Sequence, residues 1–568
     1  MGIMIIDNKK VEFTDEKNVL EVVRKAGIDL PTFCYHSELS IYGACRMCIV
    51  EDDRGKIFAS CAQLPKDGMV IYTQTPKLRK YRKTILELLL GNHERDCTSC
   101  NITGRCTLRK LAHRFGIDDV RFGELDEKLP IDDSSHSIVR NPNKCIYCGD
   151  CVRVCDEVQG LGILSFTHRG SDLRISPAFD KSLSELECVN CGQCRTVCPT
   201  GAITVKDDRE RFWDALLDKD TRVVAQIAPA VRVALGERFG LEAGTITIGK
   251  IVAALKMMGV DEVYDTGFAA DITVIEESEE FVERLKSNQD LPLFTSCCPA
   301  WVKFAEYRYP ELVDNISSCK SPQQMFGAVV KEYYRKKDEE DGKKTVMVSI
   351  MPCTAKKAEA AREEFVNNGV RDVDIVITTN ELARLIVEMG IVFDELEDQS
   401  LDMPFGLASG SGVIFGTTGG VTEAVVMRLL KDKPDHTEKQ VIFNEVRGLD
   451  NIKEASFNVD GREVRVAIVH GLKNADNLIK MIKAGEKHYD FIEVMACPGG
   501  CVSGGGQPAP IDSEIRAKRA SGLYRIDRKS FIKSSELNPL VTELFEDFLK
   551  DKKEILHVHK NSEVSYGQ

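Results

Sequence analysis

The sequence predicts a multidomain chain in which small α+β modules precede one large α/β domain. Its 568 residues are enough for about three to five domains of ordinary size. Of its 21 cysteines, the first 15 all lie before residue 200, in closely spaced groups. From about residue 209 onward, apolar runs alternate with segments of helical spacing, which is typical of mostly parallel sheets. These observations divide the chain into four parts, 1–76, 77–125, 126–208 and 209–568.

Composition narrows the functional classes. Hydrophobic residues make up 43% and charged residues 29% of the chain, as in ordinary soluble proteins. A net charge of −13 disfavours nucleic acid as a partner. The chain lacks an apolar run of the roughly 20 residues that span a membrane, and it begins without a signal peptide, so we expect a cytoplasmic protein without a membrane partner. Because disulfides are rare in the cytosol, clustered cysteines there indicate metal binding or catalysis.

The first part, 1–76, reads as a β-rich module. An apolar run, Ile3 to Ile6, precedes a turn and a second strand, and a segment of helical spacing ends at Gly27. Four cysteines follow in the irregular pattern C-x10-C-x2-C-x12-C: Cys34, Cys45, Cys48 and Cys61. Four thiolates in a loop suit a [2Fe–2S] cluster, with zinc as the alternative. The spacing and the sequence YGACRMC resemble the β-grasp ferredoxin module of complex I and its relatives.

The second part, 77–125, begins with a basic amphipathic segment, KLRKYRKTILELLLGN. His93, Cys97, Cys100 and Cys106 follow in the pattern H-x3-C-x2-C-x5-C. This resembles the [4Fe–4S] site with one histidine and three cysteine ligands found in the same group of proteins, in which a neutral ring nitrogen binds iron. His113 is the alternative histidine, but it lies in the helical stretch LRKLAHRFG and suits packing or solvent contact better.

The third part, 126–208, contains an internal repeat of the pattern C-x2-C-x2-C-x3-C. In two-cluster ferredoxins the fourth cysteine of each run serves the other cluster. We therefore assign one [4Fe–4S] cluster to the first set and a second to the other: Cys145, Cys148, Cys151 and Cys198; and Cys188, Cys191, Cys194 and Cys155. Disulfide-linked hairpins are the alternative, which a cytosolic location disfavours. None of the cluster sites predicted in the first three parts has an open ligand position for a substrate, so we expect these clusters to relay electrons.

Three motifs in the fourth part, 209–568, carry the remaining chemistry: FTSCCPAW (294–301), MPCTAKKAE (351–359) and EVMACPGGCVSGGGQPAP (493–510). In the last motif, Cys497 and Cys501 would share a face if they lie on a helical turn. The surrounding glycines would give clearance for a bulky inorganic group. Taken alone, this motif could equally be a glycine-rich loop with incidental cysteines. Together the three motifs resemble the signature motifs of FeFe-hydrogenases, and the resemblance extends over nearly the whole chain.

That resemblance implies a set of residues around an H-cluster. Cys298, Cys353, Cys497 and Cys501 would hold its [4Fe–4S] part, and Cys501 would bridge to a diiron unit with CO, cyanide and azadithiolate. Lys356 would donate a charge-assisted hydrogen bond to one cyanide. Ala228 and Pro229 match the backbone segment near the other cyanide. Four further residues match positions that line the diiron pocket, with core packing as the alternative: Gln323, Met351, Phe415 and Met495.

The resemblance also implies a proton route from Cys297 through Glu277, Ser317 and Glu280 to Arg284. Adjacent cysteines point in different directions, so Cys297 and Cys298 would have different roles. A thiol of tuned pKa can exchange protons near neutral pH. The two glutamates are three apart and would share one helix face, for which a solvated acidic surface is the alternative. Cys319 has no assignable ligand role and suits a small buried apolar position.

The expected function is therefore a hydrogenase that interconverts protons, electrons and hydrogen. Its electron partner would be ferredoxin, or NAD(P)-dependent flavin subunits in a multimeric complex, and maturases would install the diiron unit. A complex I-type electron-transfer subunit lacks the three motifs. An iron–sulfur assembly protein and a hydrogen sensor are further alternatives. The basic stretch Lys77–Lys83 could dock acidic ferredoxin or form a solvated helix face.

Overall fold

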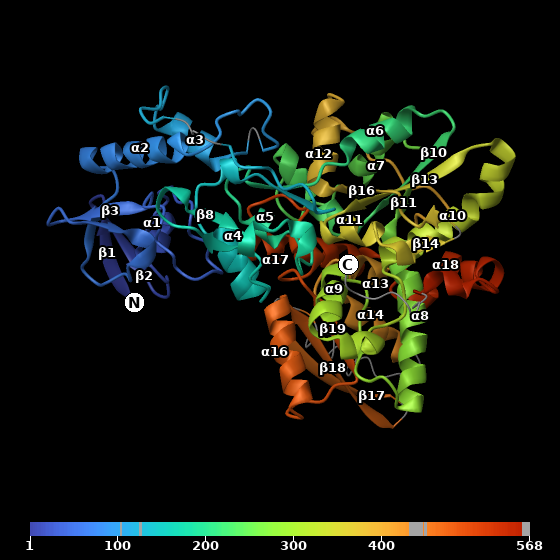
Figure 1. Cartoon of the computed structure of the whole chain (residues 1–568). Coiled ribbons are helices and arrows are strands. Elements are labelled where there is room, and N and C mark those ends of the chain that lie inside the picture. The colour runs from blue at the N-terminus through green and yellow to red at the C-terminus, as the bar shows by residue number, and fades with distance from the viewer. Residues whose placement is uncertain are drawn as a thin grey trace.

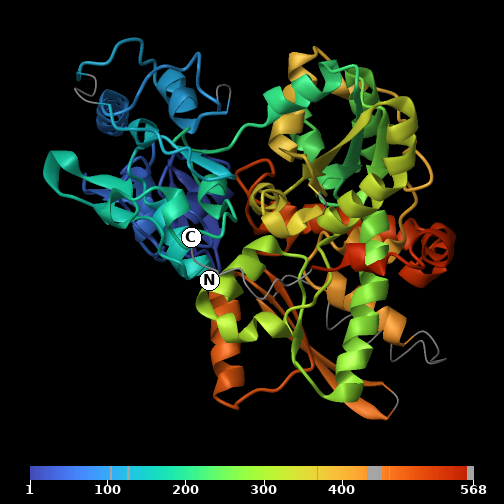
Figure 2. The same ribbon diagram turned by 45° about the vertical axis from the view of Figure 1, so that its right-hand side comes forward.

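A computed structural model describes residues 1–102, 105–123, 128–367, 369–430, 447, 451–459 and 461–558. The cysteine-rich N-terminal parts, coloured blue to cyan, lie to one side of the large domain, whose described residues include two separate four-stranded sheets (Figures 1 and 2). The predicted boundary between the second and third parts falls within 124–127, outside the described residues. Among the described helices, none is both long and apolar enough to cross a membrane.

The first part is built on a five-stranded sheet of order β2-β1-β5-β3-β4. Helix α1 (Val19–Lys25) buries four apolar side chains, and Gly27 ends it with a φ of +79°, a conformation that glycine adopts without steric cost. The strands are β1 (Gly2–Ile6), β2 (Lys9–Phe13), β3 (Ile49–Asp52), β4 (Ile57–Ala59) and β5 (Val70–Tyr72). The predicted hairpin and helix are confirmed.

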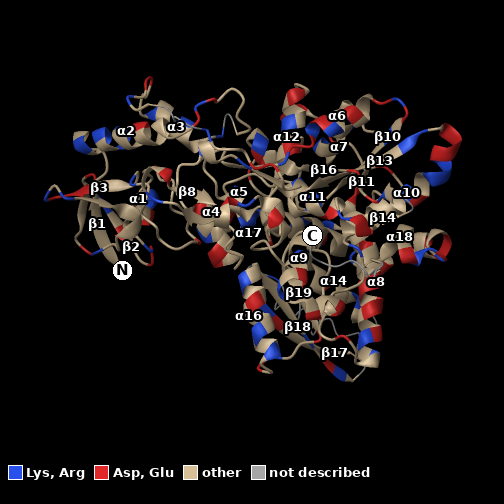
Figure 3. Cartoon of the chain, viewed as in Figure 1, with Lys and Arg blue, Asp and Glu red and all other residues tan. Residues whose placement is uncertain are grey.

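Helix α2 (Pro76–Gly91) carries the basic stretch, visible as blue at the outer end of the helix in Figure 3, and α3 (Thr107–Arg114) packs beside it. Arg82 in this stretch is not part of a surface face. It is fully buried and donates to the backbone carbonyls of Met47 and Thr73 at 3.1 and 2.8 Å. These hydrogen bonds from the buried Arg82 side chain attach α2 to the first sheet. Because Arg82 faces inward, the basic surface that could dock ferredoxin is smaller than the stretch Lys77–Lys83 suggests.

The third part shows the expected internal repeat. Each half begins with a short helix that follows a glycine with positive φ: α4 (Asp150–Arg153) follows Gly149, and α5 (Gln193–Thr196) follows Gly192. Two antiparallel pairs complete this part: β6 (Ile138–Arg140) with β9 (Ile203–Val205), and β7 (Ser165–Thr167) with β8 (Arg174–Ser176).

The first sheet of the large domain has the order β11-β10-β13-β16, and all its strand pairs are parallel. Its strands are buried runs of mainly β-branched and aliphatic residues, as expected for a sheet covered by helices. The strands are β10 (Thr221–Ile227), β11 (Glu262–Asp265), β13 (Lys344–Met351) and β16 (Ile375–Thr378). The helices packed against them are α6 (Arg209–Leu217), α7 (Ile248–Met258), α10 (Pro322–Asp341) and α12 (Thr379–Glu388).

The second sheet has the order β12-β19-β18-β17, and only the β17–β18 pair is antiparallel. Along β18, Val464, Val466 and Ile468 belong to the same core as Phe281 of α8, whereas Ala467 and Val469 belong to the core around α9 and α16. Successive side chains of β18 point to opposite faces of the sheet, so both faces of the sheet are buried. The elements are β12 (Leu293–Phe294), β17 (Ile452–Val459), β18 (Arg462–His470), β19 (Phe491–Met495), α8 (Thr266–Ser287), α9 (Pro299–Arg308) and α16 (Leu472–Lys483).

The remaining elements complete the large domain between and beside the two sheets. Helices α13 and α14 pack against the long helix α8, and α17 packs against α13. A short hairpin joins β14 to β15. These elements are α11 (Ala355–Ala360), α13 (Gly410–Ile414), α14 (Gly420–Leu429), α17 (Ser513–Lys529), α18 (Pro539–Glu543), β14 (Val366–Asn367) and β15 (Val370–Arg371). The predicted α/β architecture with mostly parallel sheets is confirmed.

Replacing Gly504 by alanine should destabilise the large domain. A Cβ atom there would lie 2.2 Å from the carbonyl oxygen of Pro352, so the backbone must move, and overpacking of this kind costs about 1–3 kcal/mol. Gly123→Ala is the matched control, because its Cβ would meet no atom of the described residues within 4 Å. We expect urea unfolding to show a lower midpoint for Gly504→Ala alone. Equal midpoints would contradict the close packing.

Candidate active site

The candidate site lies at the carboxyl ends of strands from both sheets. Ala228 directly follows β10, Met351 ends β13, Met495 ends β19, and Cys297 follows β12 by three residues. Loops after parallel strands meet at one edge of a sheet, which is where α/β domains place their sites. Here two such edges face each other, so segments distant in the sequence surround one cavity.

That cavity has a volume of about 70 Å³. All six residues predicted to lie around the cofactor line it, together with Lys356, Cys297 and two of the predicted ligands. The residues named in the sequence analysis that line it are Ala228, Pro229, Cys297, Gln323, Met351, Cys353, Lys356, Phe415, Met495 and Cys501. Thr266, Ala270, Pro322 and Gly416 also line it and were not predicted. Their side chains are small or ring-shaped, and no motif in the sequence distinguishes them.

Of the four predicted cubane ligands, two line this cavity. Cys353 and Cys501 line it, whereas Cys298 turns away and its Sγ accepts from the backbone N–H of Ala496 at 3.4 Å. The adjacent Cys297 lines the cavity, so the two neighbouring thiols point in different directions as expected. Burial is the main cause that raises the pKa of each of these thiols. Convergent buried thiols are a donor set that fits an iron–sulfur cluster.

The predicted helical turn between Cys497 and Cys501 is wrong. Cys497 lies in a bend after β19, and Cys501 starts a single 3₁₀ turn, Cys501–Ser503. Gly499 and Gly500 between them have φ values of +76° and +93°. A glycine pair in this region reverses the chain, which an α-helix does not allow. The two thiols approach one another through this reversal.

The predicted purpose of the glycines also needs correction. A Cβ on Gly500 would lie 2.6 Å from the backbone nitrogen of Thr418, and one on Gly505 would lie 2.5 Å from the carbonyl oxygen of Cys191. Neither glycine lines the cavity. These glycines therefore give clearance to neighbouring backbone segments, because loops from several parts of the fold pass close together here.

A buried ion pair holds the cavity wall. The ammonium group of Lys356, 8% exposed, lies 3.0 Å from both carboxylate oxygens of Glu359 and donates to the carbonyl of Cys297 at 3.2 Å. Gln323 donates to Glu359 at 2.9 Å and to the carbonyl of Lys356 at 3.2 Å. Burial disfavours the charged lysine, but pairing with Glu359 outweighs it and raises the pKa of Lys356. The cation therefore stays charged at the cavity. Glu359 was not singled out in the sequence, although it lies three residues after Lys356 in the same motif.

The predicted proton route is contiguous on its outer side. Ser317 donates to Glu280 at 2.7 Å, and Glu280 forms an ion pair with Arg284. Arg284 also donates to the carbonyls of Asp290 and Asp314, at 3.1 and 3.0 Å. Both glutamates lie on α8, but Glu277 is 1% exposed, so the alternative of a solvated acidic face is wrong for it.

Glu277 is the innermost acid of this route. Neither of its carboxylate oxygens accepts a well-formed hydrogen bond among the described residues, although the Ser317 hydroxyl and the Ser296 backbone N–H lie close enough to offset part of the rise in its pKa. Burial first, and then the charge of Glu280, raise its pKa to about 8. Glu277 also contributes to the raised pKa of the Cys297 thiol, which shows that the two groups lie near one another. A buried acid of this pKa can hold or release a proton near neutral pH.

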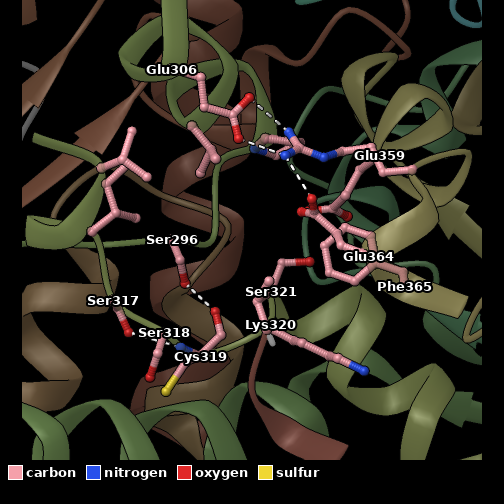
Figure 4. Close-up of a pocket in the computed structure, with 16 residues that line it drawn as sticks. Ser296, Glu306, Ser317, Ser318, Cys319, Lys320, Ser321, Glu359, Glu364 and Phe365 are labelled. Atoms are coloured by element: carbon pink, nitrogen blue, oxygen red, sulfur yellow. Dashed lines mark hydrogen bonds and ion pairs between the residues drawn. The ribbon is translucent and has the colours of Figure 1, made fainter. Parts of the chain in front are cut away.

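A second cavity, also of about 70 Å³, lies beside the route (Figure 4). Ser296, Ser317 and Cys319 form one side of it, and Glu359 and Glu364 face them from the other. The Ser296 hydroxyl donates to the carbonyl of Cys319 at 2.6 Å. Cys319 is fully buried, as predicted.

The predicted [2Fe–2S] ligands lie in two pairs, Cys34 beside Cys45 and Cys48 beside Cys61, and the neighbouring thiol is the main cause that lowers the pKa of Cys45 and of Cys48. Backbone N–H groups point at their sulfurs: Phe33 donates to Cys45, and Cys45 donates to Cys34, each at 3.4 Å. Backbone donors of this kind stabilise thiolates in iron–sulfur sites. The donor set therefore fits a two-iron cluster.

His93 fits a metal ligand in the second part. It is 8% exposed, and its Nδ1 atom is buried without a hydrogen-bond partner among the described residues. Burial lowers its pKa to about 4, so the imidazole is neutral and can donate a lone pair. His113, by contrast, lies in the last turn of α3, as the sequence indicated.

The exchanged fourth cysteines of the repeat are brought together as predicted. One cavity of about 30 Å³ is lined by Cys145, Cys148, Cys151 and Cys198. A second cavity of the same volume is lined by Cys155, Cys188, Cys191 and Cys194. Each cavity thus takes three thiols from one half of the repeat and one from the other.

The second of these cavities adjoins the candidate active site. Gln193 donates to the Sγ of Cys497 at 3.2 Å and to the carbonyl of Ser503 at 2.9 Å. Thr354, next to Cys353, donates to the carbonyl of Asn190 at 2.8 Å. Residues between cysteines of the repeat therefore touch ligand-bearing loops of the large domain. No sequence motif indicates the bridging role of Gln193.

Five family models match the chain. The model described as iron only hydrogenase large subunit, C-terminal domain, matches residues 221–505. The model of the iron hydrogenase small subunit matches 513–560, a region that the sequence analysis did not separate. A 2Fe-2S iron-sulfur cluster binding domain matches 4–76. An NADH-ubiquinone oxidoreductase-G iron-sulfur binding region matches 82–121, and a ferredoxin-like domain of NADH-quinone oxidoreductase subunit 3 matches 135–204.

The chain belongs to the iron-only, or FeFe, hydrogenase family, and it is a hydrogenase with an iron–sulfur electron relay. It is 44% identical to the NADP-reducing hydrogenase subunit HndD of Solidesulfovibrio fructosivorans over 98% of both chains. It is 37% identical to iron hydrogenase 1 of Clostridium pasteurianum, covering 96% of this chain and 97% of that protein. An apo [FeFe]-hydrogenase structure from Chlamydomonas reinhardtii, 39% identical, aligns with 62% of this chain and 98% of its own, with a TM-score of 0.55.

Glu277→Gln should change how stability depends on pH. In the unfolded chain the Glu277 carboxyl loses its proton near its ordinary pKa of 4.5, whereas the folded chain keeps it until about pH 8. The free energy of unfolding therefore decreases as the pH rises through this range, and the variant lacks this contribution. Urea unfolding at pH 5 to 8 measures it, with the half-exposed Glu279→Gln as control. Identical slopes in the wild type and Glu277→Gln would contradict the raised pKa.

Proposed function

We propose that this chain carries one [2Fe–2S] cluster, three accessory [4Fe–4S] clusters and an H-cluster, held by the twenty predicted ligands in four modules, 1–76, 77–125, 126–208 and 209–568. When bound, the H-cluster supplies an open iron position at which hydrogen is split or formed. Its four ligands would be Cys298, Cys353, Cys497 and Cys501. The cavity lined by Cys297 and Lys356 would receive its diiron unit.

Electrons would enter from two sides. The thiols of Cys34 and Cys148 belong to one packed cluster of side chains, so the first site lies next to the nearer cluster of the repeat. A Cβ on Gly201 would lie 2.9 Å from the Sγ of Cys100, so the histidine-containing site adjoins the same region. The contact between Gln193 and Cys497 then leads from the farther cluster to the large domain. Close spacing of sites is what electron transfer between them requires.

The protein would contribute charge and protons at the cavity. Lys356 points a permanent cation at the space that cyanide would occupy, where a charge-assisted hydrogen bond is strong because water is excluded. Cys297 would pass protons between the cavity and Glu277. Ser317, Glu280 and Arg284 would carry them onward to the surface. Proton and electron routes would thus reach the cavity from different elements.

The observation that carries this proposal is one cavity that is lined by Cys297, Lys356 and two of the ligand thiols, Cys353 and Cys501. An iron–sulfur assembly protein needs no proton relay beside such a cavity. Here the buried acid Glu277 and the Ser317–Glu280–Arg284 chain are present, which supports turnover.

Cys297→Ala should abolish nearly all hydrogen turnover while the iron content stays unchanged, because the thiol is the proton carrier at the cavity and not a ligand. The loss should exceed about 100-fold, the scale on which one general acid–base group contributes. Glu279→Gln, an exposed acid on the same helix as Glu277 and Glu280 but outside the route, is the control and should keep most activity. Comparable rates for the two variants would refute the relay.

Infrared spectroscopy of the matured protein tests the H-cluster directly. We expect bands from metal-bound CO and cyanide, and we expect Lys356→Met to shift the cyanide bands because a cationic donor is lost. Unshifted cyanide bands would contradict the assigned role of Lys356. Absence of all such bands after maturation would refute the H-cluster assignment.

We propose further that the chain works as a subunit of a multimeric NADP-linked enzyme rather than alone with ferredoxin. The relative matched over 98% of both chains at 44% identity is an NADP-reducing hydrogenase subunit, whereas the iron hydrogenase 1 relative is 37% identical. Purification from the native source should yield flavin-containing partner subunits. A lone 63.3 kDa chain with full ferredoxin-dependent activity would exclude the complex.

A further inference from the structure

Three arginines from three separate parts of the chain line a small cavity away from the candidate active site. Arg105 comes from the segment before α3, Arg195 from α5, and Arg384 from α12. The cavity has a volume of about 30 Å³. A fourth arginine, Arg238, lies close enough that the charge of Arg384 helps to lower its pKa, after burial. Four like charges gathered in this way repel one another unless an anion lies between them.

The acidic residues that line the same cavity are already paired. The carboxylate of Asp207 binds Arg209 through both oxygens and is 3.7 Å from Arg384. Glu381 accepts from Lys357 at 3.0 Å and from the backbone N–H groups of Asp208 and Thr378, at 2.9 and 2.8 Å. Asp207 thus partly neutralises Arg384, whereas Arg105 and Arg195 have no carboxylate partner among the described residues.

The arginine donors also outnumber their acceptors. Each guanidinium group has five N–H donors. Arg105 donates to the side-chain oxygen of Asn380 at 2.9 Å, and Arg195 donates to the carbonyls of Gln507 and Gly505 at 2.6 and 3.3 Å. Within the described ranges, the buried Nε of Arg238 has no acceptor. A group that only accepts hydrogen bonds would satisfy these donors.

We infer that this cavity binds a small inorganic anion of halide size at the junction of the second part, the third part and the large domain. A volume of about 30 Å³ holds one such ion or about two waters, and it excludes larger organic anions. The anion would join Arg105 of the second part, Arg195 of the third and Arg384 of the large domain. It would thereby hold the electron-transfer modules against the catalytic domain, in addition to the Gln193 contact.

Thermal unfolding of the full chain tests the site. A ligand that binds only the folded state raises the melting temperature with concentration. We expect sodium chloride and sodium bromide to raise it more than sodium gluconate at equal ionic strength, because gluconate does not fit. Arg384→Gln should remove the difference between halide and gluconate, whereas Arg109→Gln, an exposed arginine on α3, should keep it.

Crystals grown in bromide give a second measurement. We expect an anomalous peak between Arg105, Arg195 and Arg384 that is absent in Arg384→Gln. Equal stabilisation by chloride and gluconate, or a difference that persists in Arg384→Gln, would overturn the inference. The inference would also fail if Arg384→Gln shifted the midpoint potential of the cluster near Cys100 equally in both salts, since that cluster would then be the counter-charge.

Discussion

The buried ion pair between Lys356 and Glu359 is the interaction on which the candidate site depends. Lys356 reaches the carbonyl of Cys297, and Glu359 accepts from Gln323, so the pair joins the loops after β12 and β13 to the start of α10. Removing one partner of a buried pair leaves an uncompensated charge and typically costs about 3–5 kcal/mol. The same pair keeps a cation at the cavity wall. Lys356 and Glu359 therefore both stabilise the fold around the cavity and set the charge at its wall.

The arrangement of the two four-stranded sheets of the large domain explains why the candidate active-site cavity is enclosed. Each sheet brings its ligand-bearing loops to its own carboxyl edge, and the two edges face each other. The glycines of the segment 499–506 allow these loops to pass within van der Waals contact of the backbone at Pro352, Thr418 and Cys191. Close passage of backbone excludes water, which strengthens every electrostatic interaction inside. Protons and electrons then need dedicated routes, and α8 and the cysteine repeat lie where such routes are required.

Much of this arrangement could be predicted from local patterns. The repeat with its exchanged cysteines, the strand runs and the helical face of Glu277 and Glu280 follow from spacing, because period and ligand geometry are short-range properties. Resemblance to a family supplied the partition of Cys297 and Cys298, and the structure places these thiols in different directions. The turn at Cys497–Cys501 was mispredicted, because a spacing of four is compatible with a helix and also with a glycine reversal.

The sequence by itself therefore determined the kinds of site and the residues that bear their chemistry, since those are written in residue type and spacing. Only the tertiary structure decided which of them meet. No motif signals the contacts of Gln193 or of the arginines around the small cavity, because their partners lie up to several hundred residues away. Burial, which makes Glu277 hold its proton and keeps the His93 imidazole neutral, also arises only when the chain is packed.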